Sequence, residues 1–301
     1  MATVPGRHVR KIGEAAIELV EQQHWLDGVA DPLQMAVTAL FAAGGQFGRR
    51  VRDFLHGTWL GHPLHPLLTD IPLGAWTTAL LLDALGTRRR GFSRAADHAI
   101  GVGLAGGVAA AVTGLTDWQH TRGGDRRLGV THAFLNSAAM TAYALAWTLR
   151  RRGLAEPGRV LAGVGFIAAA SAAYLGSSLV YRKRVGVDHA VRPEPSGEFV
   201  PVLRESELAE ARPRRVEALG MSIVLVRRGS RVYALGDRCA HLGGPLSEGR
   251  VDGDALRCPW HGSLFALDDG RVLEGPSTYP QSCFEVRIRA GHVEVRAVGE
   301  G

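Results

Sequence analysis

Cysteine is scarce in this sequence: its 301 residues include only Cys239, Cys258 and Cys283. So few cysteines exclude the disulfide framework of a small secreted protein. Lysine is scarcer still, with two residues against 33 arginines, so arginine carries the formal net charge of +6. No nucleic-acid-binding motif accompanies this charge, and many of the arginines flank apolar segments, where they indicate membrane topology and contact with anionic headgroups. The expected partners therefore include membrane lipid and exclude nucleic acid.

A cleavable signal peptide is also lacking, because Arg10 and Lys11 precede an amphipathic segment and not an apolar h-region. Residues 1–56 show helical periodicity without the length of a membrane span, first around Ile12 to Val20 and again over residues 33–47. We expect an N-terminal amphipathic helical segment, residues 1–56, that lies along a membrane or caps the domain that follows.

Two of the cysteines each stand close to a histidine, as Cys239 with His241 and as Cys258 with His261. Structural zinc also takes a Cys₂His₂ set, but zinc fingers usually place Cys with Cys and His with His. In a [2Fe–2S] centre in which two histidines replace two cysteines on one iron, each loop must supply one thiolate and one imidazole. The pattern therefore predicts one [2Fe–2S] cluster per chain, with these four side chains as its ligands, and it predicts electron transfer.

The residues beside these loops resemble the Rieske ferredoxin family over roughly residues 195–298. The resemblance implies that the two cysteines bind the ferric iron, that the two histidines bind the more exposed iron, and that a Gly275-Pro276 turn covers the cluster. The side chains expected to surround the ligands are Leu242, Gly244, Trp260, Ser263, Phe265 and Pro276.

This chain departs from the high-potential members of that family, which carry an extra cysteine in each loop. Gly244 and Trp260 stand near those places, and Cys283 lies too far downstream to form the bridge, so we interpret it as a buried strand residue. Ser263 has a hydroxyl that can donate to a cluster sulfur, whereas Phe265 lacks the hydroxyl of a tyrosine. We expect a potential in the low to middle part of the range of about −150 to +300 mV.

Short β-branched runs around the ligand loops predict a small antiparallel β domain. Turns are expected at residues 252–254, 268–270 and 290–291. The runs that predict strands are residues 222–226, 231–235, 284–288 and 292–295.

The preceding part of the chain contains long apolar runs. Residues 99–116, 128–149 and 160–181 are long enough to cross a hydrocarbon core of about 30 Å. Residues 64–85 form a fourth, weaker candidate, because Asp70 and Asp83 each cost about 2.5–3.5 kcal/mol within a span. Gly103 and Gly107 form a small-xxx-small pair that favours close helix packing. We expect a transmembrane four-helix bundle.

Motifs in this region resemble a bacterial family of small four-helix membrane proteins of unknown function, over about residues 55–185. They are His62-Pro63-Leu64-His65-Pro66, the Asp70-Ile71-Pro72 that follows, Gly114-Leu115-Thr116-Asp117, and His132 with Asn136. The resemblance implies the bundle but no activity.

Several of these polar residues are expected at the end of the bundle from which the β domain emerges. They are His62, His65, Asp70, Asp117, His120, His132 and Asn136. Each taken singly is explained by an interfacial histidine or a helix cap. Together they suggest a site that binds haem, holds a metal, or exchanges protons with a quinone.

The fold class expected is multidomain, α then β. Residues 1–56 form the amphipathic segment, 57–190 the four-helix transmembrane domain and 191–301 the Rieske [2Fe–2S] domain. The expected function is that of a membrane-anchored one-electron carrier to or from a redox partner protein or quinone. Alternatives are a quinone- or haem-linked membrane oxidoreductase and a redox or iron sensor. An oxygenase catalytic subunit is excluded, since only His292 and Glu294 follow the loops to build a 2-His-1-carboxylate site.

Location and orientation are less sharply indicated. We expect a multi-pass protein of the bacterial cell membrane. Ten basic residues flank one side of the four expected spans and eight the other, so charge does not decide the orientation. The lack of an export signal favours a cytoplasmic β domain, whereas Arg151-Arg152 offers a twin-arginine alternative.

Overall fold

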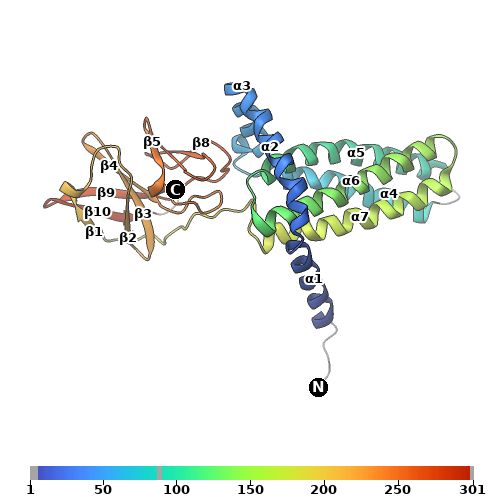
Figure 1. Ribbon diagram of the computed structural model, residues 1–301, viewed down its shortest axis with the longest axis horizontal. Helices are drawn as coiled ribbons and strands as arrows, with labels where there is room; N and C mark the ends of the chain where they lie inside the picture. Colours follow the sequence, from blue (N-terminus) through green and yellow to red (C-terminus); the bar gives the residue numbers. More distant parts are fainter. Residues whose placement is uncertain (1–5, 87–89, 299–301) are drawn as a thin grey trace, which may run out of the picture. The chain divides into compact units, whose positions relative to one another are not determined.

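The computed structural model describes residues 6–86 and 90–298, which form two compact units (Figure 1). The helical unit comprises residues up to 48 together with 64–185, and the β unit comprises residues 49–63 together with those from 186 onward. The segment 49–63 therefore packs with the β unit, although it precedes the bundle in sequence. The domain boundaries drawn from the sequence, at residues 56 and 190, stay predictions.

The helical unit is built around two helical hairpins, α4–α5 and α6–α7, that lie side by side. Within the bundle α5 also packs on α6 and α4 on α7, so α4 and α6 are diagonal to each other. The helices of the described chain are α1 (Gly6–Glu21), α2 (Asp27–Ala43), α3 (Gly45–His56), α4 (Leu64–Leu85), α5 (Arg90–Trp118), α6 (Gly123–Arg151) and α7 (Ala155–Tyr181). Short 3₁₀ turns occupy His24–Leu26 and Thr58–Leu60.

Aromatic and small side chains fill the core of the bundle. Trp76 of α4 stacks on Tyr143 of α6, with ring centroids 4.2 Å apart, and both are almost fully buried. Gly103 of α5 makes room for this stack, because a Cβ there would lie 2.2 Å from the Trp76 indole nitrogen. The small-residue pair expected to bring helices together therefore does so at Gly103.

Two helices of the described chain, Gly91–Trp118 and Ala155–Tyr181, are long and apolar enough to cross a membrane. The prediction of comparable spans in α4 and α6 is not supported by this measure. In α6 the apolar run is interrupted by polar groups such as His132 and Asn136, and α4 contains Asp70 and Asp83. The four helices pack as a bundle, but only two of them meet the criterion of a span.

A buried ion network stabilises one end of the bundle. The side chain of Arg150 is 1% exposed and donates to both carboxylate oxygens of Asp83, at 2.7 and 3.0 Å, and also to Asp97. Arg159 approaches Asp83 as well, at 3.5 Å. A buried charge is tolerated when it is paired and hydrogen-bonded, which explains how a carboxylate is accommodated in α4.

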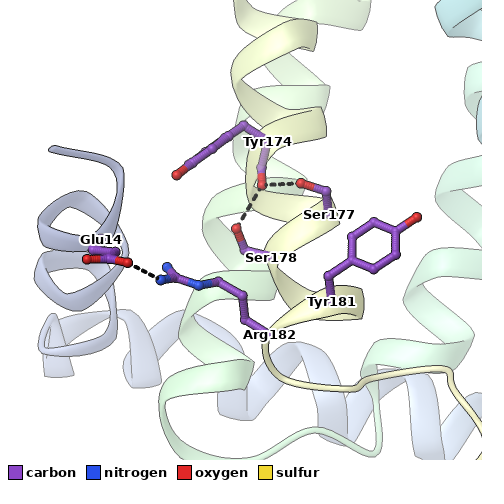
Figure 2. A pocket seen from close by; sticks show the side chains of 6 residues that line it. All are labelled: Glu14, Tyr174, Ser177, Ser178, Tyr181 and Arg182. Atoms are coloured by element: carbon purple, nitrogen blue, oxygen red, sulfur yellow. Dashed lines mark hydrogen bonds and ion pairs between the residues drawn. The ribbon is translucent and has the colours of Figure 1, made fainter. Parts of the chain in front are cut away.

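Helix α1, from the segment expected to be amphipathic, lies against the bundle. Ile17 is buried with Leu128 of α6 and Leu175 of α7. Figure 2 shows a shallow pocket beside this contact, where Glu14 of α1 pairs with Arg182 at 3.0 Å. The hydroxyls of Ser177 and Ser178 in the same pocket both donate to the carbonyl oxygen of Tyr174. The expected amphipathic stretch over residues 33–47 is divided between α2 and α3 by Gly45, which has a φ of 54°.

The β unit contains a six-stranded and a four-stranded antiparallel sheet. Their strand orders are β1-β10-β9-β4-β3-β2 and β5-β6-β7-β8. The strands are β1 (Val200–Arg204), β2 (Arg214–Ala218), β3 (Met221–Arg228), β4 (Arg231–Gly236), β5 (Arg250–Asp252), β6 (Ala255–Arg257), β7 (Leu264–Ala266), β8 (Val272–Glu274), β9 (Cys283–Arg289) and β10 (His292–Ala297). The four strands and three turns predicted from the sequence are all confirmed.

Residues that lead into the β unit are attached to it by hydrogen bonds. The backbone N–H of His189 donates to the carbonyl of Ala240 at 2.9 Å, and the Ser282 hydroxyl donates to the carbonyl of Val191 at 2.7 Å. The chain therefore reaches the ligand loops before it enters β1.

Candidate metal centre

The four predicted ligands lie on two loops that come from different sheets. Cys239 and His241 follow β4 of the larger sheet, and Cys258 and His261 lie between β6 and β7 of the smaller one. The strands are fixed by their ladders and by a buried core that includes Val224, Leu256 and Phe265. The packing of the two sheets therefore determines how far apart the loops stand.

Both loops close on themselves in the same way. In the first, Cys239 donates its N–H to Gly244 O at 2.9 Å and accepts from Gly243 N–H at 2.8 Å. In the second, Cys258 donates to Ser263 O at 2.8 Å and accepts from Gly262 N–H at 3.2 Å. Gly243 and Gly262 have φ values of 77° and 84°, which favour glycine at both turns.

The loops bring the four side chains together. Cys239 and Cys258 are both reduced and buried, 1% and 5% exposed, with their thiols in hydrogen-bond contact. The imidazole rings of His241 and His261 are 5.1 Å apart and nearly perpendicular, at 89°. Cys283 lies instead at the start of β9, half-buried, and its thiol faces the carbonyl of Gln281 at 3.8 Å. The structure thus groups two thiols and two imidazoles and leaves the third cysteine out.

Electrostatics favours the metal-binding form of two of the four side chains, Cys258 and His241. The Cys239 thiol, with the backbone amides of Trp260 and His261, holds the pKa of Cys258 at about 7, below its usual range. Burial first, and the neighbouring imidazoles second, hold the pKa of His241 well below its usual range. Metals bind the thiolate form of cysteine and the neutral form of histidine. The thiolate of Cys258 and the neutral imidazole of His241 are therefore favoured near neutral pH. The hydrogen bond to Cys258 and burial raise the pKa of the Cys239 thiol well above its usual range, so Cys239 loses its proton only when a metal binds.

The donor set fits a two-iron cluster better than a single ion. Among the described residues no group of three or more His, Cys, Asp or Glu side chains is arranged to hold one metal ion. A tetrahedral zinc site needs four donors around one point, whereas a Rieske cluster divides its donors between two irons. A Cβ at Gly244 would lie 3.2 Å from the Cys258 sulfur and 2.9 Å from the Trp260 ring. The close approach of the loops therefore requires glycine at this position.

Most of the residues expected around the ligands lie beside the loops. Ser263 is fully buried and accepts from the N–H of Ser277 at 3.0 Å, which ties the second loop to the buried Gly275-Pro276 turn. Phe265 is fully buried in β7, whereas Trp260 is 49% exposed with its ring 6.2 Å from that of His261. Leu242 is half-buried.

Gln281 holds the first loop, and sequence reasoning missed it. Its amide donates to the carbonyls of Gly236 and Arg238, at 2.7 and 2.8 Å, and accepts from Ala240 N–H at 3.0 Å. The side chain is 3% exposed. A single glutamine some forty residues after the loop carries no local signal of this role.

His56 and His189 were missed as well. Both are buried, at 2% and 8% exposure, and both act electrostatically on His241. A Cβ at Gly275 would lie 3.6 Å from the His56 ring and 3.1 Å from an Asp53 carboxylate oxygen. The segment 49–63 therefore packs on the turn beside the ligand loops, within the β unit.

In the helical unit the structure brings together part of the other predicted set. His65 and His132 are in ring contact, and the Asn136 amide lies 3.0 Å from Nε2 of His132. Asp70 is exposed, about 140° around α4 from His65 at 3.6 residues per turn. Asp117 and His120 lie at the end of α5, linked by a backbone hydrogen bond of 3.4 Å. His62 is exposed and belongs to the β unit, where its Nδ1 lies 2.9 Å from Pro63 O.

Comparison with known proteins identifies two families in the chain. Residues 198–285 match the family described as Rieske [2Fe-2S] domain, and residues 61–189 match the family described as Predicted membrane protein (DUF2231). Ferredoxin CarAc of Metapseudomonas resinovorans is 37% identical over 98 residues, which are 32% of this chain and 92% of that protein. The chain therefore belongs to the Rieske [2Fe–2S] family and carries a [2Fe–2S] cluster.

Two further relatives cover the same part of the chain. The 3-phenylpropionate/cinnamic acid dioxygenase ferredoxin subunit of Shigella flexneri is 38% identical over 72 residues, 24% of this chain and 68% of that protein. A solved structure, described as a complex of reduced oxygenase and oxidized ferredoxin in carbazole 1,9a-dioxygenase, is 34% identical, with a TM-score of 0.33. It covers 34% of this chain and 96% of that one.

Replacing Cys239, His241, Cys258 or His261 with Ala is expected to abolish the visible absorption and the reduced-state EPR signal of the cluster, because each removes a direct ligand. Cys283→Ser is the matched control. Burial raises the pKa of the Cys283 thiol to about 12, so this thiol stays protonated and its loss leaves the signal intact. A full signal in His241→Ala would contradict the ligand set.

Gln281→Met is expected to destabilise the β unit by about 2–4 kcal/mol, because it leaves one buried N–H and two buried carbonyls without their partner. The measurement is thermal unfolding of the protein together with the rate of cluster loss. Ser196→Ala removes only an exposed hydrogen bond to Glu198 O and is expected to change stability by less than about 0.5 kcal/mol. Equal effects of the two substitutions would show that Gln281 does not hold the loop.

Proposed function

We propose that this protein is a membrane-anchored Rieske electron carrier in which Cys239, His241, Cys258 and His261 bind the cluster. The observation that carries the proposal is the grouping of two buried thiols and two imidazoles on loops from separate sheets. A bound [2Fe–2S] cluster supplies one-electron redox chemistry between ferric and mixed-valence states. The two cysteines hold it from the buried side of the loops.

Backbone N–H groups of the ligand loops surround the cysteine sulfurs. The N–H groups of His241 and Leu242 point at the Cys239 sulfur, and those of Trp260 and His261 at the Cys258 sulfur. Such N–H donors stabilise negative charge on sulfur and raise the reduction potential. The half-exposed Trp260, beside His261, marks the side on which a redox partner docks, because exposed aromatic side chains are frequent anchors at interfaces.

The partner is a protein or a quinone that exchanges one electron at a time. The related ferredoxins named above belong to dioxygenase systems, which makes an oxygenase or another cluster-accepting enzyme the first class to test. One histidine, His292, follows the ligand loops in this sequence, whereas a 2-His-1-carboxylate site needs two.

The helical unit serves as a multi-pass anchor. In the apolar windows of α5 and α7, only 39% and 28% is buried inside the protein, so most of their surface faces outward. Large apolar side chains also face outward on α4 and α6, among them Leu81 at 55% and Leu145 at 53% exposure. A bundle with so much apolar surface on all of its helices fits lipid better than water.

Electron carriage is tested by mixing the dithionite-reduced, detergent-purified chain, freed of excess reductant, with oxidised cytochrome c. We expect the reduced-cluster EPR signal to decay as cytochrome c is reduced, one cytochrome c per cluster spin. The Cys239→Ala variant, which lacks the cluster signal, is expected to reduce none at this rate. A reduced cluster that persists in excess cytochrome c would rule out a carrier role and favour a sensor.

The orientation we propose places the β unit in the cytoplasm. Alkaline phosphatase, which is active only after export, is expected to be silent when fused after Gly301, whereas a cytoplasmic fluorescent reporter at the same place is expected to be bright. Strong phosphatase activity would instead support export through the Arg151-Arg152 signal.

A further inference from the structure

The two hairpins of the bundle carry the same local arrangement around one histidine each. On the first hairpin, His65 of α4 has its Nδ1 2.8 Å from the carbonyl oxygen of Ala110 on α5. On the second, His132 of α6 has its Nδ1 2.8 Å from the carbonyl oxygen of Ala172 on α7. Each hairpin therefore has a histidine whose Nδ1 contacts the backbone carbonyl of an alanine on the second helix.

A glycine makes room for each ring. Gly114 and Gly176 follow the accepting alanines by four residues and lie one helical turn further along. A Cβ at either glycine would lie 2.8 Å from the Cε1 atom of the facing histidine, closer than real Cβ contacts permit. Each ring thus packs directly against the backbone of the neighbouring helix, in the space that a side chain at the glycine would otherwise occupy.

These contacts fix the tautomer of both rings. A backbone carbonyl only accepts hydrogen bonds, so Nδ1 of His65 and of His132 must carry the proton. When such a ring is neutral, its lone pair lies on Nε2, and at His132 this lone pair accepts a hydrogen bond from the Asn136 amide. A histidine that donates Nδ1–H to a backbone carbonyl and presents Nε2 is the arrangement found around metal-binding histidines.

The two rings meet between the helices, because α4 and α6 are diagonal to each other across the bundle. Their centroids are 6.3 Å apart and their planes are nearly perpendicular, at 86°. Two imidazoles on opposite sides of one metal, at metal–nitrogen distances of about 2.0–2.1 Å, would have ring centres about 6 Å apart. The observed separation is that of a bis-imidazole pair.

We propose that Nε2 of His65 and Nε2 of His132 bind one transition-metal centre inside the bundle, distinct from the [2Fe–2S] cluster. In the structure Asn136 donates to Nε2 of His132 at 3.0 Å, and this amide must turn away when the metal binds. Imidazole suits iron, copper and zinc. No group of three His, Cys, Asp or Glu ligands for one ion is found among the described residues. The metal must therefore either carry further ligands of its own, as haem iron does, or be stable with two protein ligands.

This donor count selects the class of metal. Structural zinc takes four protein ligands and is disfavoured. The shared chemistry that remains is a bis-imidazole iron or copper centre, supplied either as haem, whose porphyrin provides the other four donors, or as a bare copper ion. The proposal does not rest on the cluster or on its partner, because its ligands lie wholly in the helical unit.

The test measures metal and haem in the full chain purified from cells given iron, copper and a haem precursor. The readouts are total iron and copper by mass spectrometry, haem by the pyridine haemochrome spectrum, and the cluster by its reduced-state EPR signal. We expect either one haem, with iron in excess of the two cluster irons, or one copper per chain.

His65→Gln and His132→Gln are the informative variants. Their amides keep a donor for the Ala110 and Ala172 carbonyls but lack the imidazole, so we expect the extra metal to fall at least about tenfold while the cluster signal is retained. His98→Gln, an exposed histidine of α5, is the control and is expected to keep the metal. A purely structural pair predicts equal metal content in all three.

If the glutamine variants fail to accumulate, a second measurement on the wild-type protein tests the proposal. Apo protein from metal-restricted cells is titrated with hemin or with Cu(I), and X-ray absorption at the bound metal is expected to show two imidazole nitrogens. Asn136→Ala removes the amide that occupies Nε2 and is expected to bind at least as tightly. Wild-type protein with no metal beyond the cluster irons, and no saturable binding of either probe, would overturn the proposal.

Discussion

The distance between two loops is the constraint on which the cluster unit depends. In the ligand set that we propose, each loop supplies one thiolate and one imidazole, so neither loop binds the cluster alone. The loops must therefore be held in position by the sheets behind them. The six-stranded sheet holds the first loop through β4 and Gln281, and the four-stranded sheet holds the second through β6 and β7. Gly244 allows the final approach, because any Cβ there meets Trp260 and the Cys258 sulfur. The fold therefore brings the four proposed ligands together.

The helical unit contains polar side chains in apolar surroundings, and each of them needs a partner. At one place Arg150 is paired with Asp83 and Asp97, so that its charge is compensated. At another, His65 and His132 each donate Nδ1–H to a backbone carbonyl of the neighbouring helix. Charge pairing compensates the buried Arg150, whereas the Nε2 atoms of the two histidines are the ligands of the metal centre that we propose.

Local patterns predicted the parts of the fold that depend on local chemistry. The strands follow β-branched runs bounded by glycine turns, and the ligand loops follow from the spacing of Cys239, His241, Cys258 and His261. The four bundle helices were also predicted, but α6 is less apolar than its length suggested. Asp70 was grouped with His65, although five residues on a helix place the two on different faces.

Contacts between distant segments could not be predicted from the sequence. The partner of Arg150, Asp83, lies 67 residues away on another helix. Gln281 and His56 reach the cluster loops from segments that carry no motif. Such pairings depend on tertiary packing, and the pattern of a single sequence contains no signal for them.

The central claim is that two imidazoles and two thiolates hold the cluster. The most direct measurement is pulsed EPR of the reduced full-length protein with ¹⁵N-labelled histidine. The account predicts strong couplings to two histidine nitrogens, and their reduction to at most one in His261→Cys if that variant retains a cluster. A reduced cluster with no histidine nitrogen coupling would contradict the assignment and point to all-sulfur ligation.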